Sequence, residues 1–267
     1  MRITRYTIYT DKPGINIRAA CIADLHSHPY NSIIESIKKI SPDVILLPGD
    51  IVEVATEYME ERNRYGLDFL REAVKLAPTF YTYGNHEIYY THAKPDQPNC
   101  STQEQFESRS ALIRSFGVHI LNDSYEHFTS PRASNAFSVG CGVSIGGLVC
   151  GRDKNPELSD DPIDKIFLHD FSALQGYKIL LCHYPHYYKE YLNNTNVDLI
   201  LSGHAHGGQW RIFGRGVYAP HQGLFPKYTS GLHEGRLLIS RGASNNLRLI
   251  PRFFNPCEVL DIRILSK

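Results

Sequence analysis

The sequence lacks the long apolar segments that mark membrane-spanning and secreted chains. No apolar run approaches the ~20 residues that a membrane-spanning helix requires. Residues 1–14 also lack the apolar stretch of a secretory signal. We therefore expect a soluble, cytoplasmic protein whose contact with membranes is at most peripheral, although a chain trimmed of an N-terminal anchor would show the same pattern.

The chain also lacks a net charge, because 28 Lys and Arg residues balance 28 Asp and Glu residues. With no basic excess, and no basic stripe interleaved with aromatic residues, the sequence gives no indication of nucleic-acid binding. Nothing in the composition predicts an oligomeric state. Histidine, in contrast, is abundant at 13 residues, and several lie beside Asp, Asn or Gly. That composition is a first indication of metal or proton chemistry.

The spacing of the cysteines does not match a recognisable disulfide or metal-binding pattern. None of the six forms a CxxC pair, and Cys21 and Cys182 lie in apolar, strand-like segments, where a free thiol behaves as a small hydrophobic side chain. In a chain of this length without a signal peptide, we expect structural thiols rather than disulfides or a thiolate metal site.

The N-terminal third alternates between strand and helix patterns. Continuous apolar runs of strand character occur at 16–26, 43–50 and 79–87, and helical spacing occurs at 31–40 and 65–77. This βαβαβ order predicts a sheet that is parallel at its centre, with right-handed crossovers.

Further along, the pattern becomes less regular. Residues 88–101 form a long segment rich in turn formers, and helical periodicity follows at 102–117, so we expect a cap region around 88–117. Ser32 and Glu35 are spaced as a capping box at the start of an earlier helix. The glycine-punctuated segment 136–151 indicates strands with bends or bulges. Without a clear linker or repeat, 1–267 is predicted to be a single domain with two sheets.

Two more apolar runs of strand character occur at 177–185 and 197–206, and polar residues able to bind a metal end these two runs and the three named above. In open α/β sheets, ligands bind beyond the carboxyl ends of the strands, so these residues are expected to meet at one edge. They are Asp24, His26, Asp50, Asn85, His86, His183, His204 and His206. Each of these residues, taken alone, is typical of a turn, a core or a surface position. Because all of them follow the carboxyl ends of strands, the set as a whole favours a metal centre.

The types of donor atom narrow the choice of metal. Imidazole nitrogen and hard oxygen, without thiolate, suit Zn, Fe or Mn. There are too many donors for one ion, and a pair of ions requires a bridging group. Asp50 stands alone at the end of its strand and is the natural bridge. Two ions about 3.5–4 Å apart would clamp a phosphoryl group and lower the pKa of bound water.

The full set and order of these motifs resembles the calcineurin-like metallophosphoesterase superfamily. The motifs are Asp24-Leu25-His26, Gly49-Asp50, Gly84-Asn85-His86-Glu87, His183 and Gly203-His204-Ala205-His206. The later segments GHAHGGQ, APHQGLFPKY, SRGAS and RFFNPCEV resemble the bacterial phosphohydrolase and phosphodiesterase branch of that superfamily. With them, the resemblance covers nearly the whole chain.

The resemblance implies a four-layer α/β/β/α sandwich with two mixed β-sheets flanked by helices. It implies two divalent or mixed-valence ions (Mn, Fe or Zn), a small phosphorylated substrate, and in-line attack by a metal-bridging hydroxide. The implied metal ligands are Asp24, His26 and His206 for one ion, Asp50 as the bridge, and Asn85, His183 and His204 for the other ion. The resemblance also implies that His86 is catalytic, contacting the scissile phosphate and protonating the leaving oxygen.

One departure from the resemblance is Glu53, which stands where relatives with an iron–tyrosinate centre have Tyr. This residue argues against a coloured ferric site. Glu87 is expected to orient its neighbours, and Gln209 is a weaker candidate for the same role. His28 either reaches the substrate phosphate or, as the interpretation we prefer, only lines the mouth of the site.

The predicted function is a metal-dependent phosphohydrolase that cleaves phosphomonoesters or phosphodiesters. Two alternatives are a pyrophosphate hydrolase acting on a nucleotide-linked lipid at a membrane, and a catalytically silent binding module on the same fold. A silent module is expected to lose ligands, and none is missing here. Further candidates for substrate contact, each equally typical of packing or of the surface, are Tyr89, Tyr90, His92, Arg152, Lys227 and Arg241.

Overall fold

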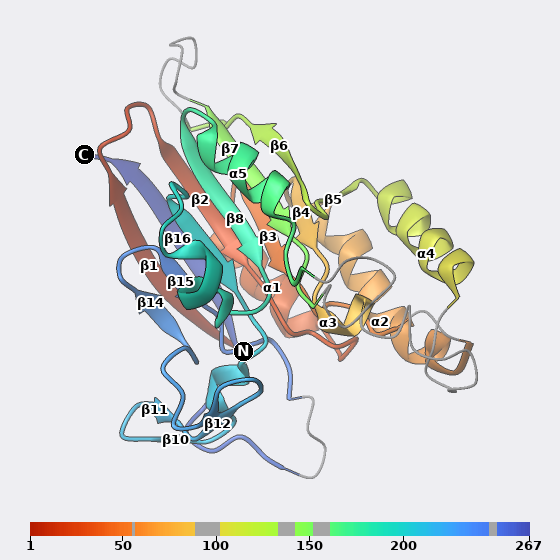
Figure 1. Cartoon of the computed structure of the whole chain (residues 1–267). Helices are drawn as coiled ribbons and strands as arrows, with labels where there is room; N and C mark the ends of the chain where they lie inside the picture. The colour runs from red at the N-terminus through yellow and green to blue at the C-terminus, as the bar shows by residue number, and fades with distance from the viewer. Residues whose placement is uncertain (55–56, 89–101, 133–141, 152–160, 246–249) are drawn as a thin grey trace.

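Two six-stranded sheets stacked face to face form the body of the protein. The computed structural model describes residues 1–267 except 55–56, 89–101, 133–141, 152–160 and 246–249. Figure 1 shows helices covering the outer faces of both sheets, while the two inner faces lie against each other. The candidate cap residues 89–101, including Tyr89, Tyr90 and His92, fall outside the described residues, as does Arg152, so the cap region stays a prediction.

The first sheet is parallel over its four last strands. In spatial order its strands are β1 (Arg2–Thr10), β16 (Glu258–Ser266), β2 (Asn16–Cys21), β3 (Val44–Pro48), β4 (Thr79–Thr82) and β5 (Val118–Ile120). Strands β2 to β5 are parallel, and β16 runs antiparallel to β2. The predicted parallel βαβαβ unit is confirmed, with its carboxyl ends along one edge.

The second sheet repeats this arrangement with antiparallel strands at both edges. Its order is β14 (Gly231–His233), β15 (Leu237–Ile239), β9 (Leu199–Ser202), β8 (Tyr177–Cys182), β7 (Val143–Leu148) and β6 (Ser124–Phe128). The four central strands are parallel. Both sheets are therefore mixed, as expected.

Helices complete the outer layers, and short hairpins extend from one end. The first sheet carries α1 (Asn31–Ile40), α2 (Glu57–Ala73) and α4 (Gln103–Ser115), and the second carries α5 (Lys165–Ala173) and the π-helix η2 (Tyr188–Leu192). The single turns α3 (Asn85–Ile88) and η3 (His206–Gly208) follow β4 and β9. Two hairpins, β10 (Arg211–Ile212) with β11 (Arg215–Gly216) and β12 (Tyr218–Ala219) with β13 (Gly223–Leu224), lie below the sheets in Figure 1.

Three apolar clusters show that the fold is the predicted four-layer sandwich. Leu46, Ile179 and Ile262 belong to the cluster between the sheets. Separate clusters lie beneath the helices on each outer side, with Phe69 in one and Phe171 in the other. Burial on both faces explains why the central strands read as continuous apolar runs.

One local prediction was wrong, and another is tested only in part, because residues 136–141 lie outside the described residues. Helix α1 begins at Asn31 after Tyr30, without a side-chain cap, so Ser32 lies inside the first turn and cannot form the expected capping box. A complete box instead begins α4, between Thr102 and Gln105. The described part of the glycine-punctuated segment is a regular strand, β7; a Cβ at Gly147 would collide with Thr82 and Leu121, so this glycine lets the sheets approach.

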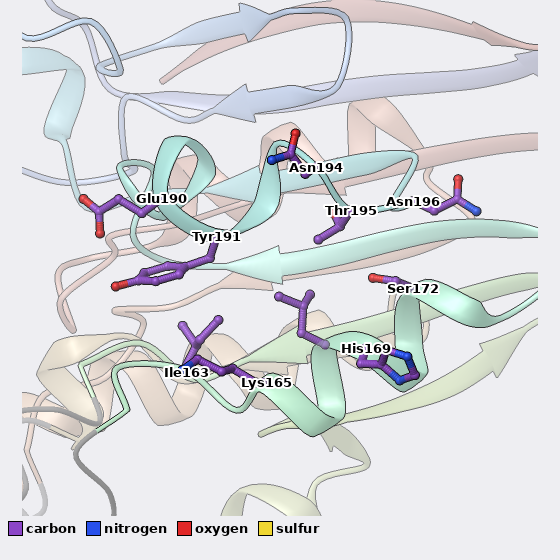
Figure 2. Close-up of a pocket in the computed structure, with 10 residues that line it drawn as sticks. Ile163, Lys165, His169, Ser172, Glu190, Tyr191, Asn194, Thr195 and Asn196 are labelled. Atoms are coloured by element: carbon purple, nitrogen blue, oxygen red, sulfur yellow. The ribbon is translucent and has the colours of Figure 1, made fainter.

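The described cysteines are free thiols, as expected, and Cys21, Cys150 and Cys182 are buried. No helix in the described part of the chain combines the length and the apolar composition of a bilayer span. A groove of about 440 Å³ lies between α5 and residues 190–196, lined by Lys165, His169 and Glu190 among others (Figure 2). None of the predicted site residues lines this groove.

Candidate metal centre

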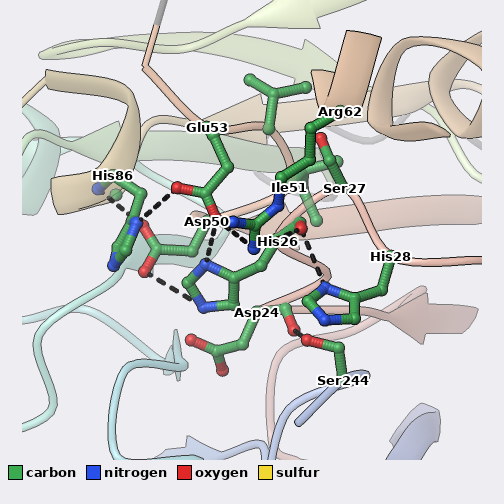
Figure 3. A network of polar contacts seen from close by, with 12 residues as sticks. Asp24, His26, Ser27, His28, Asp50, Ile51, Glu53, Arg62, His86 and Ser244 are labelled. Carbon is green, nitrogen blue, oxygen red and sulfur yellow. Dashed lines mark hydrogen bonds and ion pairs between the residues drawn. The ribbon is translucent and has the colours of Figure 1, made fainter. Parts of the chain in front are cut away.

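The predicted site residues follow strands β2, β3 and β4 of the first sheet and β8 and β9 of the second. Two backbone hydrogen bonds tie the first two loops together: Asp24 N donates to Gly49 O at 3.2 Å, and His26 N donates to Asp50 O at 2.9 Å. The two sheets thus bring loops that are up to 180 residues apart, such as those of Asp24 and His204, into direct contact. Figure 3 shows Asp24, His26, Asp50 and His86 pointing toward a common centre.

Left-handed backbone conformations are concentrated at this edge. Positive φ angles between 46° and 66° occur at Asp24, His26, Asp50, His204 and His206. Such conformations are uncommon for residues with a side chain and persist only where surrounding structure fixes them. The buried strands before each loop provide that constraint, so the fold supports an unfavourable local geometry that turns these side chains toward one another.

The first group of potential metal ligands comes from loops of both sheets. Asp24, His26 and His206 each offer a ligand atom within 4.8 Å of the others. His26 Nε2 lies 3.3 Å from His206 Nε2, and His206 Nε2 lies 3.8 Å from Asp24 Oδ1. Nitrogen and carboxylate atoms at this separation can converge on one ion.

A second group consists of Asp50, His183 and His204, again with ligand atoms within 4.8 Å. His183 Nδ1 donates a hydrogen bond to Pro48 O at 2.7 Å, so Nε2 is the ring nitrogen that faces Asp50 Oδ2, at 3.0 Å. Asp50 Oδ2 also lies 3.7 Å from His26 Nε2 of the first group. Asp50 therefore contacts both groups, which is the arrangement that a bridging carboxylate requires.

Two buried oxygen atoms are left without hydrogen-bond partners at this edge. They are Asp24 Oδ2 and Asn85 Oδ1. An unpartnered buried oxygen is costly, and in native proteins it usually has an ion, a water molecule or a functional reason. Because both residues belong to the predicted ligand set, the donor set fits a pair of cations.

Electrostatics favour the metal-binding protonation state at Asp50, His204 and His206, but not at every predicted ligand. Burial raises the pKa of Asp24, and Asp50 outweighs burial at His183 and raises its pKa to about 10, so an ion would have to displace a proton there. Burial raises the pKa of Asp50, but the neighbouring histidines His183 and His86 outweigh it and hold the pKa well below its usual range. Burial, together with the nearby His183 and His26, lowers the pKa values of His204 and His206 well below the usual range. A carboxylate and neutral imidazoles are the forms that bind metals.

His86 lies beside the two groups and is held by Glu53. Its Nδ1 donates to Glu53 Oε2 at 2.8 Å, and the side chain stays 27% exposed. Burial lowers the pKa of His86, but Asp50 and Glu53 outweigh burial and raise the pKa to about 9. The other carboxylate oxygen of Glu53 accepts from His26 Nδ1 at 3.2 Å, so Glu53 links a predicted ligand to the predicted proton donor (Figure 3).

Sequence reasoning missed Glu53 as a functional residue, since it considered this position only as the absence of Tyr. Glu53 is buried and also contacts Arg62 Nη2 at 3.2 Å. Its place three residues after Asp50, in the same loop, was the available indication. Two further neighbours were missed: Arg252 Nη2 lies 3.0 Å from His206 Nδ1, and His221 Nδ1 lies 3.1 Å from His204 Nε2.

Glu87 orients its neighbours as expected. Its carboxylate accepts backbone hydrogen bonds from Asp50 N at 3.0 Å, Ile51 N at 2.7 Å and Gly84 N at 2.7 Å, and another from the Tyr81 hydroxyl. Burial and the charge of Asp50 raise the pKa of Glu87 to about 7, whereas these donors favour its carboxylate form. Glu87 therefore fixes the loop that presents Asp50.

The remaining candidates have other contacts. Gln209 Nε2 donates to Ile250 O at 2.6 Å, so it ties C-terminal loops together. His28 Nδ1 donates to His26 O at 2.9 Å, a contact with the metal-site loop itself. Lys227 pairs with Glu234 at 3.3 Å, and Arg241 pairs with buried Glu258. Neither cation is free to serve mainly as a phosphate contact.

Comparisons with known proteins agree with this geometry. The family model for the calcineurin-like phosphoesterases matches residues 17–208, and the chain belongs to that family of metal-dependent phosphoesterases. The match contains every predicted ligand and His86. Family membership assigns the chain a calcineurin-like phosphoesterase domain and does not identify a substrate.

Several curated relatives share about a quarter of their residues with the chain. It is 26% identical to an uncharacterized metallophosphoesterase of Helicobacter pylori (100% of this chain, 64% of the relative) and 26% identical to phosphodiesterase YaeI of Escherichia coli (84% and 74%). It is 27% identical to UDP-2,3-diacylglucosamine pyrophosphatase LpxG of Chlamydia muridarum (93% and 84%). Among solved structures, the phosphopantetheinyl hydrolase PptH of Mycobacterium tuberculosis matches with a TM-score of 0.43 and 16% identity over 72% of this chain and 83% of that one.

The chain does not extend over the full length of its relatives. It spans 64% of the Helicobacter protein and 41% of a transmembrane protein with metallophosphoesterase domain from Danio rerio, to which it is 26% identical over 72% of its own length.

Proposed function

We propose that this chain is a phosphohydrolase that cleaves phosphomonoesters or phosphodiesters at a site for two metal ions. The observation that carries the proposal is the position of Asp50, whose Oδ2 lies 3.0 Å from His183 Nε2 and 3.7 Å from His26 Nε2. A carboxylate that faces both donor groups is the feature a two-ion site needs.

The residues would divide between the ions as the family resemblance implies. Asp24, His26 and His206 would hold one ion, Asp50 would be shared, and Asn85, His183 and His204 would hold the other. When bound, divalent ions would lower the pKa of a water molecule and offset the charge of the phosphate. The nitrogen and oxygen donors suit Mn, Fe or Zn.

His86 would supply the proton for the leaving oxygen. Its Nδ1 is occupied by Glu53, so Nε2 is the atom available for a substrate at the partly exposed mouth of the site. Proton transfer requires hydrogen-bond reach and a fixed ring orientation, and Glu53 provides the second of these. Glu53 would act as a positioning residue.

A second candidate is hydrolysis of a pyrophosphate bond in a nucleotide-linked lipid. The similarity to LpxG over 93% of this chain favours it. The two candidates differ in the bond attacked and in the size of the leaving group, so substrate preference separates them. A catalytically silent binding module is the least favoured candidate, because no ligand that the resemblance implies is missing from the sequence and six of the seven fall in two donor groups.

The test is turnover by the metal-stripped protein after addition of Mn²⁺, Zn²⁺ or Fe²⁺. The substrates are p-nitrophenyl phosphate, bis-p-nitrophenyl phosphate, cyclic nucleotides and nucleotide-diphospho lipids. We expect no turnover without metal and restored hydrolysis of at least one of these phosphoesters. Hydrolysis only of nucleotide-diphospho lipids would favour the second candidate, and metal binding without any turnover would favour the silent module.

A further inference from the structure

Large apolar side chains are exposed in one part of the molecule, away from the sandwich body. Most of the exposed large apolar residues in the described part of the chain lie between residues 210 and 254, although this segment is a small fraction of the chain. We call the following six the hairpin patch: Ile212, Phe213, Leu224, Phe225, Phe253 and Phe254. Soluble proteins rarely leave such residues grouped on a surface unless the surface binds something.

Three phenylalanines of the hairpin patch adopt a backbone conformation that their own side chains disfavour. Phe213, Phe225 and Phe254 have φ angles of 49°, 49° and 54°, and their exposed fractions are 101%, 64% and 89%. Left-handed positions favour Gly or Asn, and a bulky residue there is an outlier. Since these rings gain little from burial within the fold, folding stability does not explain them.

The two segments that carry the hairpin patch contain basic residues and no acidic residue, although Lys227 pairs with Glu234 just beyond the first segment. Residues 207–233 include Arg211, Arg215 and Lys227 but no Asp or Glu. Residues 250–257 add Arg252 and again no acidic residue. Exposed aromatic and aliphatic rings next to cations are the composition that binds the interface of an anionic bilayer.

The hairpin patch is fixed rigidly beside the metal centre. Val217 N donates to Gly208 O at 3.1 Å, and Arg211 Nη1 donates to Gly207 O at 2.9 Å, so the hairpins are tied to the turn that begins with His206. Arg211 N donates to Phe253 O at 3.0 Å, which joins the segment of Phe253 and Phe254 to β10. In Figure 1, β10, β11 and β12 lie together at one end of the molecule.

From these observations we propose that the hairpin patch inserts into the headgroup region of an anionic lipid bilayer and holds the metal-bearing edge close to the membrane surface. The rings supply apolar contact, and exposed Arg215, with half-buried Arg211 beside it, supplies attraction to lipid phosphate. This binding is independent of the proposed hydrolysis, because none of the six residues is a predicted ligand. It holds whether the substrate is a lipid or a soluble ester.

The test is co-sedimentation with vesicles of phosphatidylcholine, alone or mixed with phosphatidylglycerol. The variant combines Phe213→Asn, Phe225→Asn and Phe254→Asn. Asn tolerates the left-handed conformation, so this variant should fold at least as well as the native chain. We expect the native chain to bind mixed vesicles and the variant to bind at least about tenfold less tightly, since three rings leave the interface. Arg215→Gln alone should weaken binding about fivefold.

Ile166→Ser is the matched control, because Ile166 is 77% exposed on α5 and lies outside the hairpin patch. It should bind like the native chain, and all variants should keep the native metal content. Three results would overturn the proposal: no binding of mixed vesicles by the native chain, equal binding by the triple Asn variant, or equal binding of neutral and anionic vesicles. A native dimer that the triple variant converts to monomers would also overturn it, by assigning the patch to a second copy.

Discussion

The metal-site edge and the hairpin patch share one unusual feature and differ in what surrounds it. Both contain residues with side chains in the left-handed conformation, among them Asp50 at φ 55° and Phe254 at φ 54°. Asp50 is 1% exposed and fixed by loops from two sheets, whereas Phe254 is 89% exposed. At the buried edge, the surrounding structure holds the left-handed conformation in place. At the hairpins, the exposed rings in this conformation would gain contacts only from an external partner.

Substitution by Asn has different consequences for backbone strain and for function in the two regions. Asp and Asn both tolerate the left-handed region, so Asp→Asn changes at the metal edge alter the donor atom and leave the backbone preference intact. Phe→Asn changes at the hairpins remove strain and the ring together. The two regions should therefore respond in opposite ways, with function lost at one and stability gained at the other.

The largest expected effect follows Asp50→Asn. A neutral amide oxygen is a much weaker ligand for two cations than a carboxylate, so at least one ion should be lost. Activity should fall by more than the about 10²–10⁴-fold that a proton-transferring residue contributes. Metal content and kcat/KM measured on the same sample check this. A variant with native metal content and native turnover would remove Asp50 from the site.

His86→Ala should separate binding of metal from proton transfer. We expect native metal content and an activity loss of about 10²–10⁴-fold. The loss should shrink for substrates with good leaving groups such as p-nitrophenolate, because these need little protonation. Equal losses for good and poor leaving groups would argue against a proton donor.

Glu53→Gln should have a smaller effect with a distinct pH signature. The amide oxygen can still accept from His86 Nδ1, but of the charges that raise the pKa of His86, that of Asp50 remains and that of Glu53 is gone. His86 acts in its protonated form, so activity falls as pH rises through its pKa, and the variant should lose activity at lower pH than the native chain. A decrease of about 10–100-fold near neutral pH is expected.

Glu35→Gln is the matched control for Glu53→Gln, because the Glu35 side chain is 60% exposed on α1. It should change neither the rate nor the pH profile. If Glu53→Gln lowers the rate without moving the alkaline limb, its role is structural support of the loop and not positioning of His86.

The smallest expected effect is a gain in stability at the hairpins. Phe254→Asn should relieve about 1 kcal/mol of backbone strain, which corresponds to about 2–4 °C in Tm for a chain of this size. Thermal unfolding of the metal-loaded protein measures it. A lower Tm would mean that the Phe254 ring stabilises the fold, and the contrast between the two regions would fail.

Much of the fold and the candidate ligand set was predictable, because both are carried by strong local patterns. The run before Asp50 is buried on both faces, and such runs show plainly in sequence. Ligands at the ends of parallel strands share an edge by topology, so their meeting could be inferred without coordinates. Glu53, Arg252 and His221 were missed because their roles depend on contacts across loops. The Ser32 box failed because α1 begins two residues earlier than the motif requires.

The most direct test of the central claim is anomalous diffraction from crystals of the native chain grown with Mn²⁺. The account predicts two anomalous peaks, one on each side of Asp50, with Asp24, His26 and His206 around one and Asn85, His183 and His204 around the other. A single peak at full occupancy, or peaks away from Asp50, would contradict it.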